Sequence, residues 1–205
     1  MSALFDRLAA LFDATRDVGI VGLRDDSEWA RQPLRDAAVL MAVTDRQEPG
    51  LLLTHRPNTM ANHPGQVAFP GGKLEPGEDV VTAALREAEE ELAIPPASVR
   101  VIGSADAFAT GTGFHLTPVL GLVPPDIAIT PDPREVDGWF EAPLRFLLDR
   151  RNHVRKTGMF GTQELPYTEI VWEGHRIWGI TAGIIANLSH RLVWEDLIGG
   201  KATGS

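Results

Sequence analysis

The spacing of apolar residues along the chain predicts helices and strands in alternation. Near the start, apolar side chains recur every three or four positions, at Leu4, Leu8 and Leu11. This spacing predicts a helix over residues 3–16 with one buried face. Residues 37–43 form a continuous apolar run instead, which is expected of a strand that is buried on both faces.

The remaining elements follow from the same pattern. The clearest helix is expected over residues 79–92, because good helix formers fill it and two prolines follow its end. A short helix is expected at 143–150 and a final helix at 181–194. Further strands are expected at 51–55, 99–104 and 116–123, and loops at 17–36 and at the proline-rich stretch 124–133.

A hairpin is expected near the C-terminal end. Residues 168–172 and 176–179 flank the short turn sequence Glu173-Gly174-His175. Trp172 and Trp178 stand on either side of this turn, so we expect them to meet across the two strands.

Length and composition indicate a single globular unit. The chain has 205 residues, of which 43% are hydrophobic and 23% charged, as in ordinary globular proteins. Strands interleave with helices, so we expect an α/β (or α+β) fold with one sheet covered by helices. We divide the chain into an N-terminal helix and irregular extension (1–36), the main domain (37–195) and a tail (196–205).

Charge and cysteine content exclude several classes of protein. The sequence has no cysteine, which excludes disulfides and a cysteine nucleophile. The net charge of −9 disfavours binding to nucleic acid. No signal peptide or long apolar span is recognised, so we expect a cytoplasmic protein without a membrane anchor.

A cluster of acids on the predicted central helix indicates metal chemistry. Glu87, Glu90 and Glu91 are three and four residues apart and therefore share one helical face. Such carboxylates repel one another unless a cation lies between them, and Mg²⁺ prefers oxygen ligands of this kind. The alternative is a solvated acidic face. Glu78 and Arg86 are about two helical turns apart, so we expect them to form a structural ion pair.

The pattern resembles the Nudix signature, G-x5-E-x7-R-E-U-x-E-E-x-G-U, where U is a bulky aliphatic residue. The positions in register are Gly72, Glu78, Arg86, Glu87, Glu90, Glu91 and Ile94. The match of six fixed residue types has a chance probability of about 10⁻⁷ per start position. Two positions depart from the signature: Ala88 replaces a larger aliphatic residue, and Ala93 replaces the glycine that follows the helix.

The resemblance implies a fold, a reaction and roles for residues. The fold would be an α/β/α sandwich around a mixed sheet. The reaction would be attack of water on a pyrophosphate. Glu87, Glu90 and Glu91 would bind Mg²⁺, or alternatively Mn²⁺, with help from a carbonyl near Gly71 or Gly72, and Arg86 would complete the catalytic set.

The segment before the box resembles the motif of the coenzyme A pyrophosphatase branch. Residues 52–72 read Leu-Leu-Thr-His-Arg-Pro-Asn-Thr-Met-Ala-Asn-His-Pro-Gly-Gln-Val-Ala-Phe-Pro-Gly-Gly, and the segments 113–119 and 177–183 are also similar to that branch. The resemblance implies hydrolysis of coenzyme A to 3′,5′-ADP and 4′-phosphopantetheine. The expected substrate-binding residues are Arg56, His63, Gln66, Gly71, Gly72 and Lys73, with His55 as a further nearby cation.

Several alternatives stay open at this point. His63 and Gln66 are equally well explained as residues that stabilise a loop, and Arg56 as a surface arginine. Glu90, Glu135 and Glu164 are all candidates for the general base. The enzyme could act on ADP-ribose or dinucleotides instead, or the chain could be a Nudix-fold module that binds a nucleotide without cutting it. A homodimer is possible, with the N-terminal helix either on the domain or at the interface.

Overall fold

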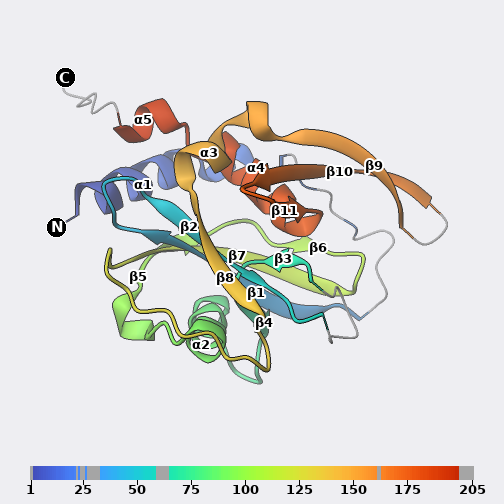
Figure 1. Cartoon of the computed structure of the whole chain (residues 1–205), viewed down its shortest axis with the longest axis horizontal. Helices are drawn as coiled ribbons and strands as arrows, with labels where there is room; N and C mark the ends of the chain where they lie inside the picture. Colours follow the sequence, from blue (N-terminus) through green and yellow to red (C-terminus); the bar gives the residue numbers. More distant parts are fainter. Residues whose placement is uncertain are drawn as a thin grey trace.

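In the computed structural model the described residues are 2–21, 23, 26, 33–58, 65–160 and 163–198. These residues form an eight-stranded sheet and a separate three-stranded sheet (Figure 1). The predicted α/β class is confirmed. The expectation of one sheet is wrong for the part of the chain that the structure describes, because the C-terminal strands pair among themselves.

The eight-stranded sheet is mixed. β1 runs parallel to β7 over its whole length, and every other pair in this sheet is antiparallel. Its strands are β1 (Arg35–Thr44), β2 (Gly50–His55), β3 (Val67–Ala68), β4 (Gly71–Lys73), β5 (Arg100–Ser104), β6 (Phe108–Ala109), β7 (Phe114–Val123) and β8 (Gly138–Pro143). The smaller sheet, in the order β11-β10-β9, contains β9 (Val154–Phe160), β10 (Gln163–Trp172) and β11 (His175–Trp178).

Helices cover both faces of the large sheet. They are α1 (Ala3–Ala14), α2 (Val80–Leu92), α3 (Leu144–Leu148), α4 (Ile180–Arg191) and α5 (Trp194–Ile198), with short 3₁₀ turns η1 (Arg16–Val18), η2 (Pro96–Ser98) and η3 (Arg150–Asn152). α2 packs on one face through a cluster of small and aliphatic residues, and α1, α3 and α4 pack on the other. β1 contributes residues to both clusters, as its unbroken apolar run predicts. Among the described residues, no helix is both long enough and apolar enough to cross a membrane.

The start and end of α2 are set by local sequence. The Asp79 carboxylate accepts hydrogen bonds from the N–H groups of Val81 and Thr82, at 2.9 and 2.8 Å, and so satisfies two donors that the helix leaves unpaired. At the other end Ala93 takes the left-handed conformation, with φ 56° and ψ 33°. The sequence has alanine here in place of the glycine that favours such a cap. The chain forms the cap nevertheless, with an alanine in the conformation that glycine favours.

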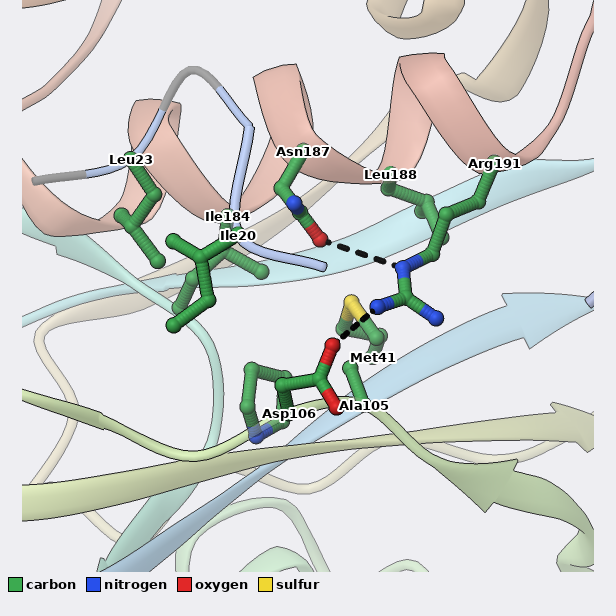
Figure 2. A pocket seen from close by; sticks show the side chains of 10 residues that line it. Ile20, Leu23, Met41, Ala105, Asp106, Ile184, Asn187, Leu188 and Arg191 are labelled. Carbon is green, nitrogen blue, oxygen red and sulfur yellow. Dashed lines mark hydrogen bonds and ion pairs between the residues drawn. The ribbon is translucent and has the colours of Figure 1, made fainter. Parts of the chain in front are cut away.

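Helix α4 is held in place by a buried cation, Arg191. The predicted helix 181–194 is divided in the structure, because α4 ends at Arg191 and α5 begins at Trp194. Arg191 is 3% exposed, and its guanidinium donates to Asp106 at 2.6 Å and to the carbonyl of Gly19 at 3.4 Å. Figure 2 shows Arg191 and Asp106 meeting beside a cavity with apolar walls. The N-terminal segment is therefore tied to α4.

The predicted hairpin exists, but its tryptophans do not meet. β10 and β11 pair with Trp172 opposite His175 and Trp178 opposite Glu169. Glu173 and Gly174 form the turn with φ of 46° and 85°, the conformation that two-residue hairpin loops require. This register places the two tryptophans on opposite faces of the ribbon, so the expected contact is wrong. Trp172 packs against Phe146 instead, with ring centroids 4.7 Å apart.

Candidate metal centre and active site

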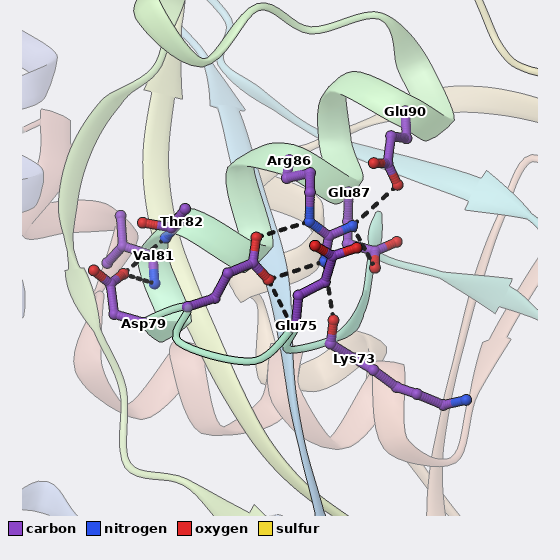
Figure 3. Close-up of polar contacts among 9 residues, drawn as sticks. Lys73, Glu75, Asp79, Val81, Thr82, Arg86, Glu87 and Glu90 are labelled. Atoms are coloured by element: carbon purple, nitrogen blue, oxygen red, sulfur yellow. Dashed lines mark hydrogen bonds and ion pairs between the residues drawn. The ribbon is translucent and has the colours of Figure 1, made fainter.

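Arg86 joins the loop before α2 to the helix itself. Its guanidinium donates to the Glu78 carboxylate, from Nε to Oε1 at 2.8 Å and from Nη2 to Oε2 at 3.1 Å. Nη2 also donates to the carbonyl of Lys73 at 3.0 Å. Figure 3 shows these contacts converging on one side of the helix. The ion pair between Glu78 and Arg86 that the sequence predicted is confirmed.

Three carboxylates lie close enough together to hold a metal ion. One oxygen from each of Glu87, Glu91 and Glu135 lies within 4.8 Å of the other two. Glu91 is buried, Glu87 is half-buried and Glu135 is exposed. Oxygen donors at this spacing fit a hard divalent cation such as Mg²⁺.

Burial raises the pKa of both helix carboxyls in this cluster. For Glu91 the main cause is burial, reinforced by the charges of Glu87 and Glu135, and the pKa reaches about 8. Burial also raises the pKa of Glu87, although the hydrogen bond from Arg86 opposes the change. A buried carboxylate is unfavourable without a compensating charge. The cluster therefore favours a bound cation.

The glycines before the box allow the backbone to approach the carboxylates. A Cβ on Gly72 would lie 2.3 Å from Oε1 of Glu87, and a Cβ on Gly71 would lie 2.4 Å from the carbonyl oxygen of Ala38. At Gly71 the clash is with backbone, so only glycine fits there. At Gly72 an added Cβ would push the Glu87 carboxylate out of its position. The backbone of Gly71 also forms a hydrogen bond with the Glu91 carboxylate. Both predicted glycines thus lie against the carboxylates.

Glu90 is placed differently from the expectation. Its carboxylate accepts a hydrogen bond from Nη1 of Arg86 at 3.0 Å, and its side chain is 51% exposed. The spacing along the helix puts Glu90 beside Glu87, but the acids whose oxygens lie within 4.8 Å of one another are Glu87, Glu91 and Glu135. Its role as a metal ligand stays a prediction.

Glu135 reaches the cluster through long-range backbone hydrogen bonds. The N–H of Asp132 donates to the carbonyl of Glu91 at 3.0 Å, and the N–H of Thr130 donates to the carbonyl of Leu92 at 3.0 Å. The N–H of Glu135 then donates to the carbonyl of Asp132 at 3.0 Å. The proline-rich loop is thereby fastened to the end of α2 and delivers Glu135. The sequence offered Glu135 only as one of three candidate bases and gave no sign of this docking.

The other expected substrate residues occupy different positions. Arg56 follows β2 and lies close enough to Glu91 for its charge to lower the pKa of that carboxyl. Gln66 lies beside Gly179, where its Nε2 would be 3.4 Å from an added Cβ. The Lys73 side chain is exposed and points away from Glu87 and Glu90 in Figure 3. His63 lies outside the described residues.

His55 faces away from the carboxylates. Its Nε2 lies 2.8 Å from Nδ1 of His175, and the His175 ring stacks on Phe140 with centroids 3.8 Å apart. Leu52 packs in the cluster with α2 and Leu53 in the cluster on the other face, so the alternation along β2 puts His55 on the face away from α2. His55 therefore joins β2 to the small sheet, and the structure gives it no contact with the metal cluster among the described residues.

Two segments that resemble the coenzyme A branch come together. The Thr181 hydroxyl, at the start of α4, donates to the carbonyl of Val67 on β3 at 2.9 Å. Gln66 and Gly179 meet next to this bond. Residues 66–67 and 179–181, far apart in the sequence, therefore pack against each other, and the N–H of Arg56 donates to the carbonyl of Gln66 at 3.0 Å.

The chain matches a known family and its curated relatives. The family model described as "NUDIX domain" matches residues 33–159. A protein named "Uncharacterized Nudix hydrolase NudL" from Shigella flexneri is 43% identical over 166 residues, covering 78% of this chain and 84% of that protein. A protein with the same name from Escherichia fergusonii is 43% identical over 160 residues, covering 76% and 81%.

Solved structures also resemble this one. A Nudix hydrolase from M. smegmatis, RenU, has a TM-score of 0.48 and 23% sequence identity, over 54% of this chain and 71% of that chain. An Ap4A hydrolase from C. elegans has a TM-score of 0.46 and 22% identity, over 54% and 81%.

Proposed function

The chain belongs to the Nudix family, and we propose that it is a Mg²⁺-dependent pyrophosphohydrolase that cuts coenzyme A or acyl-coenzyme A into 3′,5′-ADP and 4′-phosphopantetheine. Family membership supports hydrolysis of a pyrophosphate bond. The observation that carries the proposal is the cluster of Glu87, Glu91 and Glu135, in which a buried carboxyl faces two other acids. Among the described residues, the positive charges recorded at this cluster are Arg86, which binds Glu87, and Arg56, which acts on Glu91. They do not match the three carboxylates in number.

Glu87, Glu91 and Glu135 are the groups that would hold the ion, and Glu90 joins them as a predicted ligand. A bound Mg²⁺ would neutralise phosphate oxygens and lower the pKa of a water molecule. Arg86 is a positioning residue, since it binds Glu78, Glu87 and Glu90 and so orients the carboxylates. Mn²⁺ is the alternative cation.

The remaining chemistry is assigned to residues near the cluster. Arg56 follows β2, and its positive charge lies close enough to Glu91 to lower the pKa of that carboxyl. A guanidinium in this position is suited to bind a substrate phosphate. Among the candidate bases, Glu135 is the exposed acid within the cluster, whereas Glu164 belongs to β10 in the other sheet. We therefore favour Glu135 to orient or deprotonate the attacking water.

The choice of coenzyme A rests on the resemblance of residues 52–72, 113–119 and 177–183 to that branch. The contact between the first and third of these segments supports it, because Thr181 binds the carbonyl of Val67 and Gly179 lies beside Gln66, which pairs with the backbone of Arg56. His63 and Lys73 stay predicted contacts for the 3′-phosphate. A cytoplasmic location also stays a prediction.

Product analysis tests this proposal. The protein would be incubated with Mg²⁺ and coenzyme A, and in parallel with ADP-ribose, and the products identified by mass spectrometry. We expect 3′,5′-ADP and 4′-phosphopantetheine, and we expect EDTA or the substitution Glu91→Gln to abolish them. Cleavage of ADP-ribose alone would reject coenzyme A and favour a broader nucleotide pyrophosphatase. If neither compound is cut but both bind, the chain is a nucleotide-binding module.

A further inference from the structure

β9 and β10 form an arm that leaves the body of the molecule. β11 pairs only with residues 169–172 of β10, so the arm beyond them has two strands among the described residues. Figure 1 shows this part projecting away from the large sheet. The side chains of residues 154–157 and of Met159 are exposed, and they belong to both faces of the strand. A two-stranded ribbon is marginally stable alone in water, so this arm is suited to gaining a partner.

The hydrogen-bonding direction of each residue in the arm follows from one contact. The N–H of Gly179 donates to the carbonyl of Thr168 at 3.3 Å, so the main chain of Thr168 faces β11 and turns away from β9. Thr168 stands opposite Arg155 in the ladder. Main-chain groups alternate between the two sides of a strand, so Arg155, Thr157 and Met159 turn their N–H and C=O groups to the outer edge of β9.

The two edges of the arm differ in their capacity to pair. Pro166 lies two residues before Thr168 on β10, so its missing N–H faces the outer edge of that strand, where it blocks pairing. The outer edge of β9 carries no proline. Its Lys156 is bound within the arm to Glu169 on β10. Edge strands are commonly protected by proline and by free charges, and β9 has only Arg155 in that role.

We propose that the outer edge of β9 pairs antiparallel with β9 of a second copy, across a two-fold axis at Thr157. In this register the Thr157 residues of the two chains stand opposite each other, and Arg155 of each chain stands opposite Met159 of the other. All of these residues turn their main-chain groups outward, so each such pair exchanges two hydrogen bonds. The result is one sheet that runs through both molecules.

The side chains of β9 are complementary to themselves in this register. The long stem of Arg155 packs along the flexible thioether of Met159, which is 67% exposed in the single chain. Lys156 faces Gly158, which leaves room for its ion pair with Glu169. Moving the axis to Arg155 would place two guanidinium groups directly opposite each other, which is unfavourable. The strand therefore selects a closed pair of identical chains as its partner.

Sedimentation equilibrium tests the assembly. We expect wild-type protein at micromolar concentration to show twice the chain mass of 22.3 kDa. Thr157→Pro removes one outward N–H and leaves the hydrogen bonds to β10 in place, so it should raise the dimer dissociation constant at least tenfold. Thr157→Val keeps the N–H and should change that constant less than threefold. A wild-type protein that stays monomeric overturns the proposal, as does a Thr157→Pro dimer of unchanged affinity.

Amide exchange on the wild-type protein provides a second measurement that needs no variant. The outward amides of Arg155, Thr157 and Met159 should become protected as the protein concentration rises through the dissociation constant. The inward amides of Lys156 and Gly158 bond to β10 in either state, so their protection should not change. Equal behaviour of the two sets would overturn the proposal, even if Thr157→Pro fails to fold.

Discussion

All five N–H groups of the Arg86 guanidinium donate hydrogen bonds within residues 73–90, which form the loop before α2 and the helix itself. Two reach Glu78, one reaches Glu87 at 3.1 Å, one reaches Glu90 at 3.0 Å and one reaches the carbonyl of Lys73. Arginine has five N–H groups in a rigid planar fork. One side chain thus determines where two of the predicted metal ligands lie.

Arg86→Lys should therefore impair the site more than the loss of one ion pair would suggest. A lysine keeps the charge but cannot form the paired bonds to Glu78. We expect kcat and Mn²⁺ affinity to fall by about 10- to 100-fold, as is usual when a residue that orients metal ligands is changed. Arg151→Lys is the matched control, since Arg151 binds Asp149 in a similar paired geometry on the surface. Full activity in Arg86→Lys would contradict the positioning role.

Glu91 predicts a pH-dependent stability in the metal-free protein. Burial raises its pKa to about 8, so at low pH the proton is held in both the folded and the unfolded chain. As the pH rises to 8, the unfolded carboxyl loses its proton first, and the free energy of unfolding falls, by an amount on the order of a few kcal/mol. The Glu91→Gln variant has no carboxyl at this position, so its free energy of unfolding should not fall in this way.

Denaturation in EDTA at pH 5 and pH 8 measures the effect. Glu91→Gln should be more stable than wild type at pH 8, and the difference should shrink at pH 5. Added Mg²⁺ should stabilise the wild type at pH 8 and leave the variant unchanged. Glu89→Gln, an exposed glutamate of the same helix, serves as the control for the change in formal charge. A pH-independent difference would mean that Glu91 ionises normally.

Glu135→Gln distinguishes binding of the metal from activation of water. If Glu135 holds the ion, the loss of one negative ligand should weaken Mn²⁺ binding about tenfold or more, which calorimetry measures. If it acts only on the water, Mn²⁺ affinity should hold while kcat falls. Glu164→Gln is the control, because Glu164 lies on β10 in the other sheet. Unchanged affinity and unchanged kcat would remove Glu135 from the site.

The sequence predicted those parts of the site that depend on short-range spacing. Glu78 directly precedes the N-cap residue Asp79, so the start of the helix holds it within reach of Arg86, about two turns further on. Asp79 begins that helix through bonds to its first turn. Glu135 could not be predicted in the same way. Its position depends on hydrogen bonds from the Asp132 and Thr130 backbone to the far end of α2, and backbone bonds leave no pattern in side-chain identity.

β9 and the part of β10 before residue 168 escaped prediction for a related reason, although the hairpin of β10 and β11 was predicted. β9 has exposed residues on both faces and contains Gly158, and β10 contains Pro166, so neither strand shows the regular alternation that marks a half-buried strand. The tryptophan contact failed because the register follows from the two-residue turn at Glu173, not from the aromatic residues. Pairing between strands is decided by turn geometry and burial, and composition records neither directly.

Ala93 offers a stabilising substitution. An alanine in the left-handed conformation is strained by roughly 1–2 kcal/mol, whereas glycine adopts it freely but loses more entropy on folding. Ala93→Gly, which restores the glycine of the signature, should therefore raise the free energy of unfolding by about 0.5–1 kcal/mol. Ala97→Gly is the control, because the residue lies in η2 without a positive φ and should destabilise. Chemical denaturation decides between these outcomes.

Substituting Asp106 should lower the free energy of unfolding more than substituting its partner Arg191. The Arg191 side chain is 2% exposed and that of Asp106 is 49% exposed. Asp106→Ala leaves a buried guanidinium with longer contacts of 3.4 Å to Asn187 and Gly19, which should cost about 2–4 kcal/mol. Arg191→Met leaves Asp106 in contact with water and fills the space with an apolar side chain, so it should cost less. Urea denaturation of both variants and of the double variant measures the coupling. A larger loss for Arg191→Met would show that the carbonyl contacts of the guanidinium, rather than its charge pairing, hold the N-terminal segment against α4.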